Sequence, residues 1–191
     1  MSRTFTSMAV LLTLALLATI GVGFYSFALD VSEHKKDVFL IHFYLGLTTA
    51  FAILLVHCLI FTYFLGTGRW VKEVGMAYRL PDVPYPKATR ELKRRAFPPA
   101  LFSMLTAIAT AAAGAGAQLQ AWPWQVHATL ALLTLAVNLW AFRIEHTTLT
   151  ENALILQAVM DEVDRIRRAR GLASNATALA EEAPPRRSAD G

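Results

Sequence analysis

Histidine side chains lie inside two of the most apolar stretches of the chain, where they are able to ligate a metal centre. His42 and His57 fall in one stretch and His127 in another, with His146 just beyond its end. Polar side chains inside apolar helices are costly and usually face other helices. Two imidazoles that face each other there can supply both axial ligands of a haem b iron. His42 and His127 are therefore candidate cofactor-binding and metal-ligating residues.

These two histidines occupy matching positions in their stretches. His42 lies about five residues into the stretch 38–65, and His127 lies about five residues into 122–142. At 1.5 Å per residue both fall roughly 7 Å below the same boundary of the bundle. In an up-and-down four-helix bundle these two helices are diagonal neighbours, so we expect the two rings to meet across the core.

A second candidate haem pair comprises His57 and His146. His57 follows His42 by 15 residues, whereas His146 follows His127 by 19 residues. At 1.5 Å per residue the two levels differ by about 6 Å. The pair therefore meets only if the helix that carries His57 is tilted or kinked near Gly46.

Two histidines on each of two diagonal helices resemble the histidine layout of cytochrome b-type haem bundles. The resemblance covers only the second and fourth apolar stretches, and it implies haem b as a cofactor and electron transfer as an activity. The segment from His57 through Tyr63-Phe64 and Gly66-Thr67-Gly68 to Arg69-Trp70 is also similar to small bacterial four-helix membrane proteins of uncharacterised role. That second similarity implies no activity.

Further polar side chains continue the line of His127 along its helix. At about 100° per residue, Thr134, Asn138 and Glu145 fall close to one line with His127. A second line of small or polar residues, in the stretch 98–119, comprises Ser103, Thr106, Thr110 and Gly114. Both lines predict faces turned toward the bundle interior. The alternative to cofactor binding is that the histidines are structural hydrogen-bond partners of threonine, asparagine or backbone carbonyls.

Four charge-free apolar stretches must position these residues, and each has the roughly 20 residues that a membrane-spanning helix needs. They cover about 7–29, 38–65, 98–119 and 122–142. We expect an all-α polytopic membrane protein, with an up-and-down four-helix transmembrane domain over 1–147. A cytoplasmic amphipathic helix over 148–171 and a disordered tail over 172–191 follow. The alternative for the first stretch is a cleaved signal peptide ending near Ser26-Phe27-Ala28.

The overall composition agrees with this fold class. The chain has 191 residues, of which 55% are hydrophobic and 17% charged, and its mean hydropathy is +0.42. Soluble domains are about 45–50% apolar and about 25% charged, so a soluble enzyme, a disordered chain and a nucleic-acid module are disfavoured. The single cysteine, Cys58, excludes a disulfide framework. No internal repeat is apparent in the sequence.

The basic residues predict the orientation of the bundle. The segment 69–95 holds eight lysines and arginines against three acids. Because basic loops stay in the cytoplasm, we expect an inner (plasma) membrane protein with both termini cytoplasmic and without a nucleic-acid partner. Its partners are then the bilayer, anionic lipid headgroups, another membrane protein or a second copy of the chain. The expected lipid or partner surface comprises Arg69, Trp70, Lys72, Lys93, Arg94 and Arg95.

The segments outside the apolar stretches carry helix-boundary signals. Gly66 and Gly68 predict the end of the second helix, followed by a basic loop over 66–97. Pro98 and Pro99 suit the first turn of the third helix. The stretch 148–171 could form a coiled coil, lie on the inner membrane face or pack against 69–95.

Three functional classes remain on sequence alone. The leading expectation is a structural, assembly or partner-binding membrane subunit, because the sequence holds no nucleophile constellation or phosphate loop. The second is a haem b electron-transfer protein that uses His42 and His127. The third is a small transporter or channel formed by several copies, lined by the Thr134–Asn138 stripe.

Overall fold

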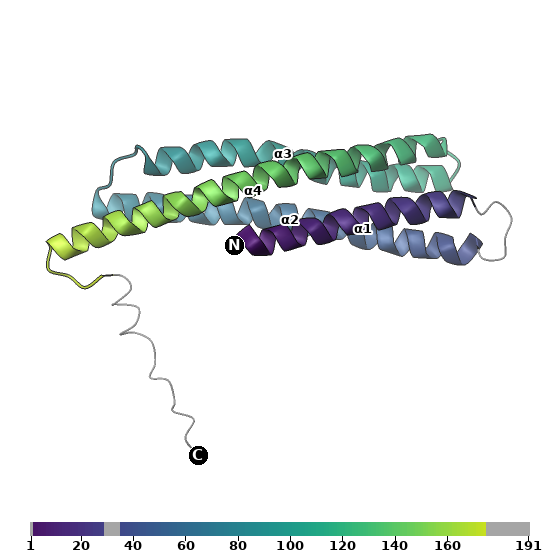
Figure 1. The fold of residues 1–191 in the computed structure, drawn as a ribbon. Coiled ribbons are helices and arrows are strands. Elements are labelled where there is room, and N and C mark those ends of the chain that lie inside the picture. The colour runs from purple at the N-terminus through teal and green to yellow at the C-terminus, as the bar shows by residue number, and fades with distance from the viewer. Residues whose placement is uncertain (1, 29–34, 175–191) are drawn as a thin grey trace, which may run out of the picture.

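The computed structural model describes residues 2–28 and 35–174, and this part of the chain is helical with no strand. Its four helices are α1 (Ser2–Ala28), α2 (Lys35–Tyr78), α3 (Tyr85–Gln118) and α4 (Trp124–Ala169). Consecutive helices run in opposite directions (Figure 1). The expected tail falls largely outside the described residues, and so does most of the link between α1 and α2.

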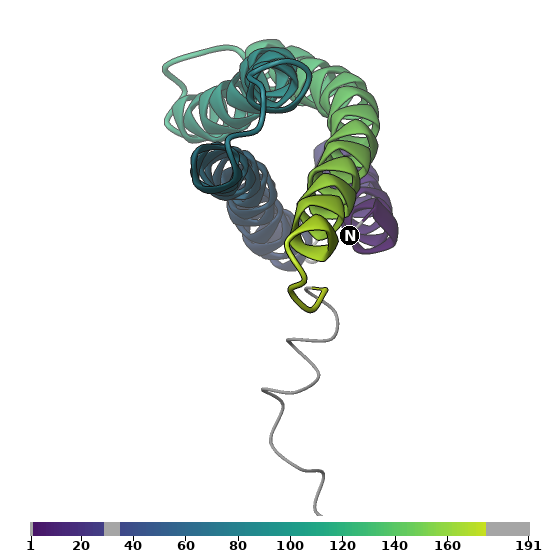
Figure 2. The same cartoon turned by 90° about the vertical axis from the view of Figure 1, so that its left-hand side faces the viewer.

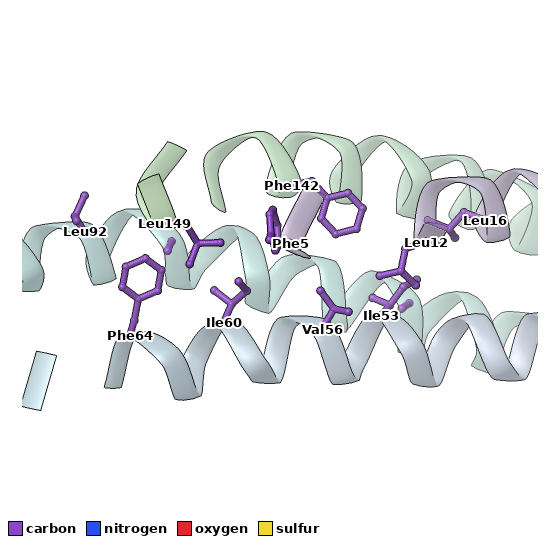
Figure 3. Packing of buried hydrophobic residues seen from close by; sticks show 12 residues of the cluster. Phe5, Leu12, Leu16, Ile53, Val56, Ile60, Phe64, Leu92, Phe142 and Leu149 are labelled. Carbon is purple, nitrogen blue, oxygen red and sulfur yellow. The ribbon is translucent and has the colours of Figure 1, made fainter. Parts of the chain in front are cut away.

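The helices surround one elongated core. Viewed end-on they follow one another around the bundle in chain order, so α2 and α4 lie on a diagonal, as predicted (Figure 2). Buried apolar side chains from all four helices, among them Phe5, Ile60, Leu92 and Phe142, form a continuous row along the axis (Figure 3). The diagonal places the inner faces of α2 and α4 opposite each other.

All four helices are long and apolar enough to cross a membrane. Most of their apolar side chains point outward. Leu11, Leu55, Leu132 and Phe102, one from each helix, are roughly half exposed or more. By contrast, buried polar residues such as Thr49, Asn138 and Glu145 point inward. This distribution is the reverse of a water-soluble bundle, in which the polar face is outermost.

Helices α2, α3 and α4 continue past the start of α1 and pack together as a three-helix extension (Figure 1). Its core contains Val71 of α2 with Val159 and Val163 of α4. Trp70 packs against this core and is partly buried. The fourth apolar stretch and the expected amphipathic helix are one continuous helix, and its last turns pack against residues 69–95, one of the three predicted arrangements. We call this extension the basic end of the bundle.

Two of the predicted helix boundaries are wrong. Helix α2 continues through Gly66 and Gly68 to Tyr78. A glycine inside a helix costs about 1 kcal/mol, which is less than the roughly 1.5–3 kcal/mol gained by burying a residue such as Val71. A Cβ at position 68 would come within 3.0 Å of the Lys93 Nζ atom, the mobile end of a long side chain of α3.

The start of α3 also differs from the prediction. The helix begins at Tyr85, with Pro86 in its first turn, and Pro98 and Pro99 lie inside it. An interior proline costs about 3 kcal/mol. Buried residues on both sides of the pair, Ala96 and Ala100, hold the helix in place. The expected basic loop is therefore mostly helix.

Replacing Val159 with aspartate is expected to melt the three-helix extension. Val159 is fully buried, and an unpaired buried charge costs roughly 3–5 kcal/mol. Limited proteolysis of the full-length protein should show new cleavage within residues 69–95 and 150–169. The matched control is Leu154→Asp, on the same helix at a side chain that is 68% exposed. Equal protease sensitivity of the two variants would contradict the packing described.

Candidate functional site

His42 and His127 meet inside the bundle at the end opposite the basic end. Their ring centroids are 6.0 Å apart and their planes are inclined by 82°. His42 comes from α2 and His127 from α4, across the diagonal. The prediction that these two side chains lie at one level and face one another is confirmed. The hydrogen bonds of the two rings determine which ring nitrogen is available to bind a metal.

Both rings are held in the same way by the backbone of a neighbouring helix. The Nδ1 atom of His42 lies 3.0 Å from the Thr19 carbonyl oxygen, and that of His127 lies 2.9 Å from the Thr110 carbonyl oxygen. A carbonyl oxygen only accepts, so Nδ1 carries the proton in each ring. The lone pair of a neutral imidazole then lies on Nε2. Within the described residues, neither Nε2 atom has a hydrogen-bond partner.

Each ring also lies against a glycine on the helix that supplies its carbonyl. A Cβ at Gly23 would come within 2.8 Å of the His42 ring, and one at Gly114 within 2.9 Å of the His127 ring. Real side chains do not approach so closely, so each ring occupies space that only glycine leaves free. Gly114 therefore faces the bundle interior, as predicted, and Gly23 plays the same part on α1.

Paired threonines complete two equivalent half-sites. The Thr19 and Thr49 hydroxyls are 3.2 Å apart, and the Thr110 and Thr134 hydroxyls are 2.7 Å apart. In each half-site the histidine precedes its threonine by seven residues, and the facing threonine precedes the glycine by four. The hairpins α1–α2 and α3–α4 therefore carry the same pattern.

Sequence reasoning missed this correspondence. The signal was present as two spacings: His-x6-Thr at 42–49 and 127–134, and Thr-x3-Gly at 19–23 and 110–114. Four residues on two pairs of helices are too few to stand out against an apolar background. Their significance becomes visible only when the helices are placed side by side.

A second polar cluster surrounds His57 deeper in the core. Its Nδ1 atom lies 2.7 Å from Glu145 Oε1, and its Nε2 atom lies 3.2 Å from Asn138 Oδ1. Asn138 Nδ2 donates to the Thr134 carbonyl oxygen at 2.8 Å. The Phe142 ring stacks on His57 at 5.6 Å. His57, Asn138 and Glu145 are completely buried.

The hydrogen bonds fix how many protons this cluster holds. Because Asn138 Nδ2 donates to a carbonyl, its Oδ1 accepts, and His57 Nε2 must carry a proton. A further proton lies between His57 Nδ1 and Glu145 Oε1, either as an imidazolium beside a carboxylate or as a neutral ring beside a carboxylic acid. In both cases the pair is neutral overall, which an apolar core strongly favours.

The structure does not bring His57 and His146 together. Both ring nitrogens of His57 already have partners, whereas His146 is exposed at the surface between α1 and α4. It lines a shallow apolar groove there with Arg143 and Thr6. The predicted stripe residues Thr134, Asn138 and Glu145 are all buried and point into the core.

The predicted surface residues are spread over the basic end. Arg69 pairs with Glu73 at 2.8 Å, and Arg95 pairs with Glu151 at 2.7 Å. Lys72 and Arg94 are exposed, and Lys93 is partly buried against Gly68. Exposed ion pairs of this kind are worth at most about 1 kcal/mol. They shape a charged surface more than they stabilise the fold.

Beside these residues, a cavity of about 470 Å³ is lined by Lys72, Arg79 and Arg90 together with Asp82. Arg90 donates two hydrogen bonds to the Asp82 carboxylate, at 3.1 and 2.8 Å. These bonds hold the pKa of Asp82 below its ordinary value. In the described part of the chain Lys72 and Arg79 have no ion-pair partner.

Taken together, the described residues contain no group of three or more histidine, cysteine or acidic side chains able to hold a metal ion. The His42–His127 pair is therefore not a zinc-type or carboxylate-type centre. Two imidazoles with free Nε2 atoms suit a metal whose other ligands come from a macrocycle, as in haem. The His57 cluster suits the binding of a proton.

Single replacements of His57 or Glu145 by leucine are expected to destabilise the protein by roughly 3–5 kcal/mol each, because each leaves a buried polar group without its partner. The double variant should cost much less than the sum, since it removes both members of the pair. Equilibrium unfolding in detergent provides the measurement. Additive effects would contradict a direct His57–Glu145 interaction.

The conservative variant Glu145→Gln serves as the control. A glutamine amide can donate to Nδ1 of a neutral His57, so the cluster keeps its hydrogen bonds with one proton fewer. We expect it to be clearly more stable than Glu145→Leu. Equal losses for glutamine and leucine would show that the hydrogen bond contributes little.

Comparisons of the chain with family models, with curated proteins and with solved structures find no match.

Proposed function

We propose that the chain is an integral membrane protein that binds one haem b between His42 and His127 and transfers electrons. The observation that carries this proposal is the pair of opposed imidazoles, 6.0 Å apart, each with Nδ1 bound to a backbone carbonyl. The membrane location is supported by four helices that are long and apolar enough to span. The geometry therefore favours the second of the three functional classes over the first.

The distance between the rings suits two axial ligands on one metal. Metal–imidazole bonds are about 2.0–2.1 Å, and the ring centroid lies roughly 1.2 Å beyond the nitrogen, so two rings that held one metal between them would have centroids about 6.5 Å apart, close to the observed 6.0 Å. Metal-binding histidines almost always donate their other ring N–H to a carbonyl or carboxylate. Both His42 and His127 have that partner, which orients Nε2 and raises its basicity. A bound haem b supplies one-electron chemistry.

The equivalence of the two half-sites further supports a shared ligand. A histidine that only stabilises helix packing needs one partner. Two such histidines have no reason each to have the same kinds of neighbours, namely a backbone carbonyl, a threonine pair and a glycine. A planar macrocycle that is ligated from both faces requires the same arrangement of side chains from each hairpin. The proposed orientation places this site near the outer face and the basic end in the cytoplasm.

A membrane subunit that also binds a partner is a second candidate role, favoured by the basic end. The extension presents Lys72 and Arg79 around an open cavity. Unpaired cations beside apolar side chains suit an acidic protein surface or anionic headgroups. This role is compatible with electron transfer, which requires a docking partner. Nothing specific in the described geometry favours a channel.

The absorption spectrum of the purified full-length protein tests the haem proposal. We expect a Soret band and a reduced α-band in the wild type, and their loss in His42→Gln and in His127→Gln. Glutamine can still hydrogen-bond to the carbonyl but does not ligate the iron. The matched control, His146→Gln, lies on the same helix as His127 but is exposed, and should keep the bands. A wild-type protein without a Soret band would end the proposal.

Replacing Gly23 with alanine is expected to lower the haem content strongly. The added Cβ would lie 2.8 Å from the His42 ring and displace it from its carbonyl partner. The control is Gly21→Ala, two residues away on α1, where a Cβ meets nothing within 4 Å. Pyridine haemochrome analysis gives the haem-to-protein ratio. Equal ratios in the two variants would contradict the predicted role of Gly23.

A further inference from the structure

Three buried oxygen atoms in the core have no hydrogen-bond partner in the described structure. They are Glu145 Oε2, Asn152 Oδ1 and Ser103 Oγ. Their side chains are completely buried. More than nine in ten buried polar groups in proteins are satisfied, by protein or by ordered water. Three unsatisfied atoms in one bundle therefore point to a missing partner.

These atoms lie at neighbouring levels along the axis of the core. Glu145 and Asn152 are seven residues apart, which places them on one face of α4 and separates them by about 10 Å of helix rise. Thr110 of α3 faces Thr134 of α4. Since the two helices are antiparallel, Ser103 lies level with the part of α4 between Asn138 and Glu145. Measured along the bundle axis, all three atoms therefore lie level with the His57–Glu145 pair or nearer to the basic end.

Water is the partner that fits the chemistry of this set. An ionised carboxylate oxygen and an amide oxygen only accept, so each requires a donor, whereas a serine hydroxyl both donates and accepts. A short file of water molecules can donate to Glu145 Oε2 and Asn152 Oδ1 and exchange hydrogen bonds with Ser103. Buried waters in proteins typically make about three hydrogen bonds to such groups.

Polar side chains lead from Asn152 toward the basic end. Asn152 Nδ2 donates to the Tyr63 hydroxyl at 3.0 Å and to Thr67 Oγ1 at 3.2 Å. Tyr63 and Thr67 are only partly buried. Asn152 therefore joins the closed core, through its orphaned Oδ1, to hydroxyl groups that approach the surface.

We propose that the His57–Glu145 pair is a proton-binding site, connected to solvent at the basic end by water that runs past Asn152. A proton from solvent passes along the file to Glu145 Oε2, and rotation of the carboxyl group lets it exchange with the proton shared with His57. The pair then changes from neutral to a net charge of +1. Release of the Oε2 proton to the same waters restores the neutral pair.

No other ionisable group competes for this proton in the interior. Among the buried side chains of residues 3–28 and 36–174, His57 and Glu145 are the only ionisable ones. The elements packed around them contribute Phe5, Ile60 and Phe142, which are apolar. Arg143 and His146 of α4 are exposed. This proposal does not depend on haem binding.

Hydrogen exchange at the His57 ring tests the connection. The full-length protein, labelled with 15N-histidine in lipid nanodiscs, gives ring N–H signals that a His57→Gln variant assigns. We expect exchange with water to be much faster than that of the neighbouring backbone amides. Asn152→Leu should slow it by about tenfold or more, because exchange then requires local opening.

A matched control and a second variant keep the test decisive. Thr150→Val changes an exposed residue of α4 whose hydroxyl bonds only its own helix, and should leave the rate unchanged. Tyr63→Phe combined with Thr67→Val removes the exit hydroxyls with little change of volume, and should also slow exchange if Asn152→Leu does not fold. Wild-type exchange as slow as that of the backbone, or rates unaffected by both variants, would overturn the proposal.

Discussion

The core of this bundle holds buried polar side chains among its apolar ones, and its exterior is largely apolar along the four candidate membrane spans. An interior hydrogen-bonding group that water does not reach needs a partner on its own or a neighbouring helix, because hydrocarbon offers none. This requirement determines how the helices fit together. Thr19 with Thr49, Thr110 with Thr134, and His57 with Glu145 each join two helices. Apolar packing fills the space between these contacts but does not select their register.

The same requirement explains the difference between the two histidine clusters. His57 has both ring nitrogens satisfied by protein groups and fits a neutral, proton-holding pair. His42 and His127 have one nitrogen satisfied and the other unpaired among the described residues. Both rings are only partly buried, near the end of the bundle, so their Nε2 atoms remain available to a ligand. The carbonyl partners and the glycines prepare the same geometry on both sides.

Much of this arrangement follows from the sequence. The four apolar stretches, the diagonal relation of the second and fourth helices, and the common level of His42 and His127 depend on helix length and rise alone. The pairing of His57 with Glu145 could not be predicted from the sequence, because a shift of α4 by a single turn would place a different residue opposite His57. Continuation of α2 through Gly68 depends on the tertiary packing of residues beyond it, such as Val71 against Val159 and Val163. The helix-boundary signals of glycine and proline are local, so they do not include the free energy of tertiary packing.

The proposed haem function requires that His42 and His127 together hold one metal. Electron paramagnetic resonance of the oxidised full-length protein tests this most directly. Because the two ring planes are inclined by 82°, a haem held by both side chains would give a low-spin ferric signal with the strong anisotropy of perpendicular imidazole ligands. A high-spin signal, a low-spin signal typical of parallel rings, or the absence of any haem signal would contradict it.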